Sequence, residues 1–229
     1  IESAELPKTA QPSIGRFVEV YDELGRNGDS VISIQMMRSI SGTVDAARQA
    51  ADITETNVTV VDSDFTSRSM GMIVKEAAKA AQEGKSVEEI LEIVEDAKKR
   101  TTLYLTVVNL DNLIKGGRIS QVMGMFSNLL NIKLFLQVIN GKIEIIQKGR
   151  GLKSLQKKYD EIFEQMKAAP NGIQEIGIMH AGLSDFNEGN IARVRELFPD
   201  VPLTIVTTSP IIMSHTGVDA MAITYLENK

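Results

Sequence analysis

Three consecutive residues, Ser41-Gly42-Thr43, carry the clearest chemical signal in the sequence. They follow an apolar strand expected over 31–36, and they directly precede a helix expected over 44–52. The start of a helix leaves backbone N–H groups without intrahelical partners and carries the positive end of the helix dipole. Two hydroxyls and a glycine at the start of a helix therefore predict a binding site for a small anion, such as a carboxylate or a phosphate. The alternative interpretation is that Ser41 is only the N-cap of the helix.

Four further polar segments are predicted to lie in loops. They are Thr9-Ala10-Gln11-Pro12-Ser13, Lys115-Gly116-Gly117-Arg118-Ile119, Lys148-Gly149-Arg150 and Ser214-His215-Thr216-Gly217. Glycine beside a cation lets the backbone approach a ligand closely, and arginine can bind an oxyanion through two parallel hydrogen bonds. The alternatives are a solvated loop for Lys115 and Arg118 and a purely structural role for His215. Neither basic segment matches the phosphate-binding patterns G-x-x-x-x-G-K-[ST] or G-x-G-x-x-G.

The elements that must position these segments alternate between helices and strands up to about residue 100. We expect helices over 14–24, 44–52, 70–83 and 86–100, and strands over 31–36 and 57–61. Ser86 and Glu89 form a capping box at the start of the last of these helices. This alternation predicts a parallel sheet covered on both faces, with ligands bound beyond the carboxyl ends of its strands. The segments 38–43 and 62–67 follow those ends.

The pattern changes from Thr101 onward. We expect strands over 103–108, 134–139, 142–147, 175–180, 203–207 and 220–226, and helices over 110–114, 122–130, 152–169 and 185–197. Asn140-Gly141 is the strongest short-range signal for a β-hairpin. We therefore predict two α/β domains: residues 1–100 with a three-layer α/β/α parallel sheet, and residues 101–229 with a two-layer α/β mixed sheet.

Composition excludes several classes of function. The 229 residues carry a net charge of −5, which does not suggest a nucleic-acid-binding surface. Cysteine is absent, so a disulfide scaffold, a thiol nucleophile and a cysteine-ligated metal are excluded, and His180 and His215 lack the acidic neighbours of a metal site. No apolar run is long enough to span a membrane, and residues 1–5 do not resemble a signal peptide, so we expect a cytoplasmic location.

Several of these segments together carry a family resemblance. The stretches are Lys8-Thr9-Ala10-Gln11-Pro12-Ser13, Ile40-Ser41-Gly42-Thr43, Leu113 through Lys115-Gly116-Gly117-Arg118-Ile119-Ser120, Leu129-Leu130-Asn131-Ile132-Lys133, Asn140-Gly141-Lys142-Ile143, Lys148-Gly149-Arg150-Gly151 and Ser214-His215-Thr216-Gly217. In order and spacing they resemble the DegV family of bacterial fatty-acid-binding proteins over almost the whole chain. The Lys-Gly-Gly-Arg-Ile block followed by Leu-Leu-Asn-Ile-Lys is the most specific part of the match.

The resemblance implies a fold and a function. It implies two α/β domains with a buried acyl chain between them, and a ligand carboxylate held by Thr9, Ser41 and Gly42. Family members are the acyl-carrying subunit of a two-component fatty acid kinase, whose separate ATP-dependent kinase protein phosphorylates the carboxylate for phospholipid synthesis. Arg150 and His215 match family positions near the carboxylate and the kinase-facing rim, and Arg118 matches the arginine of the Lys-Gly-Gly-Arg block.

The chain also departs from the family pattern. Members usually begin with a strand that ends in Asp-Ser, whereas this sequence starts downstream of it, which predicts an N-terminally truncated fragment. Ala10 stands where serine is common, and Met37-Arg38 replace two serines before Ser41. Leu134 replaces a proline, and Val218-Asp219 replace Pro-Gly after His215. We expect these changes to alter the pocket shape and the preferred acyl chain.

The leading hypothesis is a fatty-acid carrier that is not itself an enzyme and needs no cofactor. The helix start at Gly42-Thr43 would stabilise the carboxylate, and some of the ten methionines would line the acyl tunnel. The expected partners are a long-chain fatty acid and a fatty acid kinase protein, with no nucleic acid and with transient membrane contact allowed.

Two alternatives stay open. One is a serine hydrolase with Ser41 as nucleophile and His215 as base, although Gly-x-Ser-x-Gly is lacking. The other is a module that binds a phosphorylated metabolite through Lys115, Arg118 and Arg150.

Overall fold

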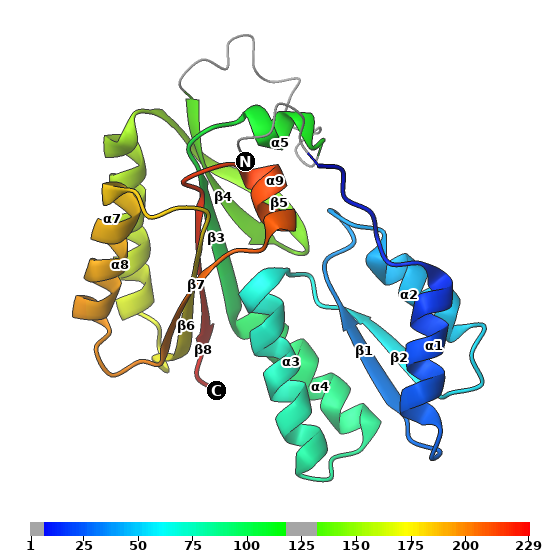
Figure 1. Ribbon diagram of the computed structural model, residues 1–229. Coiled ribbons are helices and arrows are strands. Elements are labelled where there is room, and N and C mark those ends of the chain that lie inside the picture. Colours follow the sequence, from blue (N-terminus) through cyan, green and yellow to red (C-terminus); the bar gives the residue numbers. More distant parts are fainter. Residues whose placement is uncertain (1–6, 118–131) are drawn as a thin grey trace. The chain divides into compact units, whose positions relative to one another are not determined.

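The computed structural model describes residues 7–117 and 132–229 (Figure 1). The described residues form two compact units. Residues 10–99 and 140–142 make up the amino-terminal unit, and residues 7–9, 100–117, 132–139 and 143–229 make up the carboxyl-terminal unit. As predicted, the fold is mixed α/β, with a parallel sheet in one unit and a larger mixed sheet in the other. The helix predicted over 122–130 lies outside the described residues.

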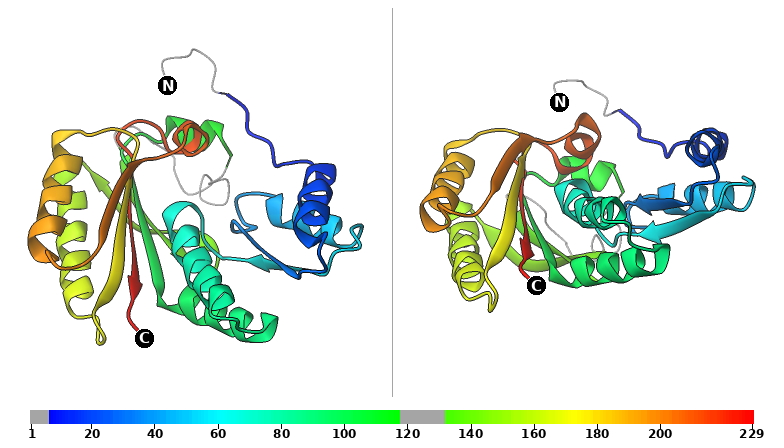
Figure 2. Two further views of the ribbon diagram at one scale, coloured as in Figure 1. Left: turned by 60° about the horizontal axis from the view of Figure 1, so that its bottom comes forward. Right: turned by 90° about the horizontal axis from the view of Figure 1, so that it is seen from below.

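The amino-terminal unit alternates between helices and strands as expected. Its elements are α1 (Ile14–Gly25), β1 (Val31–Gln35), α2 (Thr43–Ala51), β2 (Val58–Asp62), α3 (Ser67–Gln82) and α4 (Val87–Arg100). Strands β1 and β2 pair in parallel, with Val31 opposite Val58 and Gln35 opposite Asp62. Figures 1 and 2 show α1 and α2 on one side of the two strands and α3 and α4 on the other. The unit therefore has the three layers that the alternating pattern predicts.

Local capping explains where two of these helices begin. Ser13 caps α1, since its side chain accepts a hydrogen bond from the Arg16 N–H. The predicted capping box of α4 is confirmed: the Ser86 N–H donates to Glu89 Oε2 at 2.8 Å, and the Glu89 N–H donates to Ser86 Oγ at 3.2 Å. Helix α3 begins three residues earlier than predicted. Its first residues are polar and look like a loop, but Ser69 is fully buried.

The carboxyl-terminal unit is built on a six-stranded mixed sheet. Its elements are β3 (Thr101–Val107), α5 (Asp111–Lys115), β4 (Ile132–Ile139), β5 (Lys142–Arg150), α7 (Leu152–Lys167), β6 (Ile173–His180), α8 (Asp185–Leu197), β7 (Leu203–Thr207), α9 (Pro210–Thr216) and β8 (Met221–Glu227). The strand order is β5-β4-β3-β8-β6-β7. Strands β6 and β7 pair in parallel, whereas β3 pairs antiparallel with β4 and β8, and β6 pairs antiparallel with β8. The predicted hairpin is confirmed, because Asn140 (φ 49°) and Gly141 (φ 69°) adopt the two positive φ angles of a type I′ turn.

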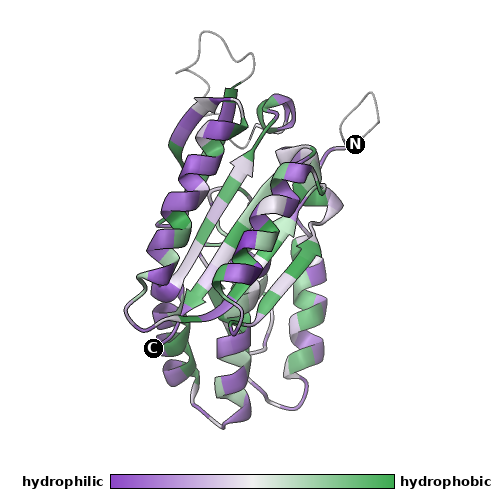
Figure 3. Ribbon diagram, turned by 90° about the vertical axis from the view of Figure 1, so that its left-hand side faces the viewer, coloured by the Kyte–Doolittle hydropathy of each residue, from purple (hydrophilic) through white to green (hydrophobic). Residues whose placement is uncertain are grey.

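Helices α7 and α8 cover one face of this sheet and close its main core (Figure 1). In Figure 3, seen from the side of these helices, hydrophilic and hydrophobic residues alternate along them, whereas the strands behind are mostly white to green. Tyr159 of α7 lies at the centre of the core. Its ring centroid is 4.9 Å from that of Phe135 on β4, and its hydroxyl forms a 2.6 Å hydrogen bond with the Thr106 hydroxyl on β3.

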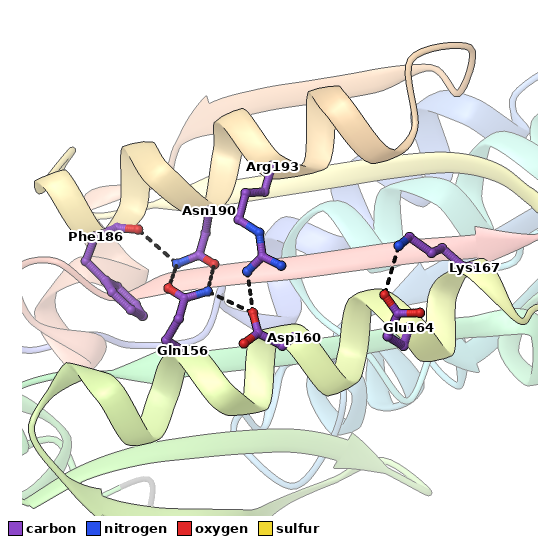
Figure 4. A network of polar contacts seen from close by, with 7 residues as sticks. All are labelled: Gln156, Asp160, Glu164, Lys167, Phe186, Asn190 and Arg193. Atoms are coloured by element: carbon purple, nitrogen blue, oxygen red, sulfur yellow. Dashed lines mark hydrogen bonds and ion pairs between the residues drawn. The ribbon is translucent and has the colours of Figure 1, made fainter.

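Polar side chains join α7 to α8 at the surface (Figure 4). The Gln156 and Asn190 amides exchange hydrogen bonds of 3.1 Å and 3.3 Å, and Asn190 is buried. Arg193 forms an ion pair with Asp160, whose pKa it lowers, and lies 5.0 Å from the centroid of the Phe163 ring. Because the two amides can exchange both hydrogen bonds in only one alignment, the pair sets the axial position of α7 relative to α8.

Candidate functional site

The start of α2 is where Ser41, Gly42 and Thr43 come together. The hydroxyls of Ser41 and Thr43 form a 2.7 Å hydrogen bond, and the Thr43 N–H donates to Ser41 Oγ at 3.3 Å. The N-cap residue is Gly42, which has no side chain, and Ser41 Oγ is the side-chain acceptor for the first N–H of the helix. Ser41 therefore lies one residue before the N-cap, although its hydroxyl accepts an N–H of the first turn as a capping side chain does. One of the two hydroxyls must donate to the other, which leaves one hydroxyl hydrogen for an outside acceptor.

Near this helix start, two arginines lie beside the single carboxylate of Asp45. Asp45, in the first turn of α2, would oppose an anion bound there. Arg38 Nε lies 2.9 Å from one of its carboxylate oxygens, and Arg48 Nη1 lies 3.8 Å from the other. These side chains are largely exposed, so the ion pairs add little stability. Their consequence is local: the Asp45 charge is offset, and the donors at the helix start can face an anion.

The loops after β1 and β2 meet at one edge of the parallel sheet, as the alternating pattern predicts. The side chain of Asp62 at the end of β2 accepts the Arg38 N–H at 3.1 Å and the Asp64 N–H at 2.9 Å. The Met37 N–H donates to the Phe65 carbonyl at 2.8 Å. These bonds tie the two loops together and hold the strand-to-helix connection that leads to Ser41.

A second cluster of candidate residues lies in the carboxyl-terminal unit. His215, near the end of α9, forms a 3.0 Å hydrogen bond through Nε2 with the Thr9 hydroxyl. Helices α5 and α9 pack together here, and the Asn112 side chain donates to the Ser214 carbonyl at 3.3 Å. A Cβ atom added to Gly116 would lie 2.3 Å from His215 Nδ1. Gly116 therefore makes room for the imidazole, a role that its Lys-Gly-Gly-Arg segment did not reveal in the sequence.

Arg150 does not join the Thr9–His215 cluster of its unit. Arg150 is exposed at the end of β5, and its side chain forms no hydrogen bond or ion pair with another described residue. Arg118 lies outside the described residues. Ser41 belongs to the amino-terminal unit, where its hydroxyl bonds to Thr43, and His215 to the carboxyl-terminal unit, where Nε2 bonds to Thr9.

Neither a metal site nor a membrane-spanning helix is found in the part of the chain that the structure describes. Within residues 7–117 and 132–229, no three histidine, aspartate or glutamate side chains converge in a way that could hold a metal ion. None of the helices described in these ranges combines the length and the apolar character needed to cross a membrane.

Comparison with known proteins identifies the family. The sequence profile of the DegV family, described as a family of uncharacterised proteins, matches residues 1–228. The chain belongs to the DegV family. A DegV domain-containing protein of Streptococcus pneumoniae is 42% identical over 222 residues, which cover 97% of this chain and 78% of the relative. The predicted family resemblance is thus confirmed, and the relatives are bacterial.

Solved DegV structures share the fold. A DegV family protein from Thermus thermophilus, whose structure is described as fatty-acid binding, superposes with a TM-score of 0.84 at 30% identity and covers 99% of this chain and 81% of its own. The fatty acid kinase (Fak) B3 protein of Streptococcus pneumoniae, solved loaded with linoleic acid, has a TM-score of 0.81 at 26% identity and covers 99% and 80%. The mixed α/β fold class predicted for this DegV chain is confirmed.

Proposed function

We propose that this DegV protein binds a long-chain fatty acid and holds its carboxylate at the start of α2. The observation that carries the proposal is the start of α2, where the Ser41–Thr43 hydroxyl pair leaves one hydrogen for an acceptor. Two similar DegV structures support the proposal, since one is described as fatty-acid binding and the other was solved loaded with linoleic acid. Thr9 and His215, which are already joined by a hydrogen bond, are the further carboxylate ligands in this proposal.

The energetics favour a carboxylate that is hydrogen-bonded and an acyl chain that is removed from water. Burial of each CH₂ contributes about 0.8 kcal/mol, so a chain of about 16 carbons contributes on the order of 10 kcal/mol before the costs of binding. A carboxylate enclosed beside that chain would take up a proton unless donors stabilised its charge. The hydroxyl pair and the helix start supply such donors.

Replacing Ser41 with alanine tests this proposal. Hydrogen bonds to charged groups contribute about 1.5–3 kcal/mol, so we expect palmitate to bind roughly 10- to 150-fold more weakly. Isothermal titration calorimetry measures the affinity. Ser86→Ala is the matched control, because that serine caps α4 and should lower only the melting temperature. Unchanged palmitate affinity in Ser41→Ala would show that the helix start does not hold the carboxylate.

The finer part of the proposal is that the bound acid is presented to a separate kinase. The carboxylate would attack the γ-phosphate of ATP and give an acyl phosphate and ADP, which is a step governed by positioning and electrostatics. This protein would carry the acyl chain without catalysing the transfer, and the acyl phosphate would supply phospholipid synthesis. The similarity to the fatty acid kinase B3 protein supports the proposal, as does Arg150, an exposed cation that binds no described residue.

The Arg150→Ala variant distinguishes binding of the fatty acid from its presentation to the kinase. We expect palmitate affinity to stay within a few-fold, because the Arg150 side chain forms no hydrogen bond with Thr9 or His215, while acyl-phosphate formation with the kinase and ATP falls at least about tenfold. Lys153→Ala, which removes a neighbouring exposed cation, is the control and should retain activity. Equal loss of binding and phosphorylation in Arg150→Ala would place this arginine at the carboxylate and contradict the presentation role.

A further inference from the structure

The sequence contains three Asn-Gly pairs, and each of them lies in a turn. They are Asn27-Gly28, Asn140-Gly141 and Asn171-Gly172, and the three asparagines are exposed. In such a pair the backbone nitrogen of the glycine can attack the side-chain amide before it, because glycine has no Cβ atom to hinder the approach. Since the three pairs share this chemistry, a difference in their reactivity must come from the fold.

The fold engages the attacking nitrogen in two of the three pairs. The Gly28 N–H donates to the Gly25 carbonyl at 2.8 Å, and the Gly172 N–H donates to the Ala169 carbonyl at 3.0 Å. A hydrogen-bonded N–H must be released before its nitrogen can attack, and that release costs free energy. The two turns therefore slow the reaction at Asn27 and at Asn171.

The third pair lacks this protection. Gly141 is the second residue of the type I′ turn between β4 and β5, and its N–H forms no hydrogen bond with another described residue. The Asn140 side chain also has no hydrogen-bond partner in the described ranges. The nitrogen and the amide that it attacks are thus both available, at a residue that is exposed to water.

We propose that Asn140 is a site of spontaneous deamidation. The Gly141 nitrogen forms a bond to Cγ of Asn140, the Cγ–Nδ2 bond breaks, and the proton of the attacking nitrogen leaves with the amide group as ammonia. The resulting succinimide ring then takes up one water molecule. Opening at one ring carbonyl gives aspartate, and opening at the other gives isoaspartate, in which the main chain runs through the former side chain.

Either product places a new carboxylate next to a residue that already lies against one. A Cβ atom added to Gly141 would lie 2.6 Å from Asp64 Oδ1, so this turn residue and Asp64 are in close contact. The other oxygen of Asp64 pairs with Lys98, whose Nζ lies 2.7 Å away. A second carboxylate adds repulsion between like charges, and isoaspartate also lengthens the main chain of a two-residue turn. The modified protein should therefore melt at a lower temperature.

Peptide mapping by mass spectrometry, on folded protein kept in ¹⁸O-labelled water at mildly alkaline pH, tests the inference. Breaking one amide hydrogen bond corresponds to roughly 2- to 12-fold in rate, so Asn140 should gain label at least about twofold faster than Asn27 and Asn171. Protein unfolded in urea is the control, in which the three sites should react at similar rates. Equal rates in the folded protein, or a slower rate at Asn140, would overturn the inference.

The consequence for stability is tested with Asn140→Asp, which carries the charge of the product from the start. Its melting temperature should lie below that of wild type, and the difference should shrink when Asp64→Asn removes the like charge. Asn171→Asp is the matched control, because it places the same charge in the exposed turn before β6. If Asn140→Asp melts no lower than Asn171→Asp, the repulsion at Asp64 is wrong.

Discussion

Replacing Tyr159 with alanine should lower the free energy of unfolding by about 3–5 kcal/mol, because the loss of a buried aromatic ring leaves a cavity. Tyr159 is 1% exposed and packs against rings from two neighbouring elements, Phe135 on β4 and Phe186 on α8. The cavity would lie where α7 meets the sheet, and the surrounding side chains belong to several elements, so it cannot easily collapse. Urea unfolding followed by circular dichroism measures the change.

Tyr159→Phe is the control that separates packing from hydrogen bonding. It keeps the ring but leaves the Thr106 hydroxyl, which is 1% exposed, without its 2.6 Å partner. An unpaired buried polar group costs about 1–3 kcal/mol, so this variant should lose clearly less stability than Tyr159→Ala. If the two variants lost the same amount, the ring itself would contribute little to the core.

Stability should fall steeply above pH 10. Burial raises the pKa of all four tyrosines, Tyr21, Tyr104, Tyr159 and Tyr225, and that of Tyr104 reaches about 12. Below pH 10 the tyrosines hold their protons in both the folded and the unfolded chain. Between pH 10 and 12 the unfolded chain releases these protons while the folded chain retains them, so rising pH favours unfolding. At 1.36 kcal/mol for each pKa unit, Tyr104 alone accounts for a loss of roughly 3 kcal/mol by pH 12.

Tyrosinate absorbance at 295 nm and circular dichroism, recorded together against pH, measure this effect. We expect both signals to change in one transition, because the tyrosines ionise only as the chain unfolds. The chain has no cysteine, so no thiol titrates in the same range. Tyr104→Phe, which removes one of the raised pKa values, should shift the transition to higher pH or reduce its slope. Tyrosinate formation near pH 10 without loss of structure would contradict the predicted shifts.

Local sequence determined most of the secondary structure. The Asn140-Gly141 hairpin, the Ser86–Glu89 capping box and the helix over 185–197 all appear as predicted, because each depends on residues only a few positions apart. The position of Ser41-Gly42-Thr43 at the start of a helix is equally local. Family membership also followed from the sequence, through short motifs in a characteristic order and spacing.

Tertiary structure alone decided what the site residues touch. Thr9 and His215 are 206 positions apart, and no local pattern predicts their hydrogen bond. The Gln11 side chain, 31 positions away, lies where a Cβ atom of Gly42 would be, and the His215 ring lies where a Cβ atom of Gly116 would be. Side chains distant in sequence meet only after the chain has folded, so their contacts depend on packing that local propensities do not contain.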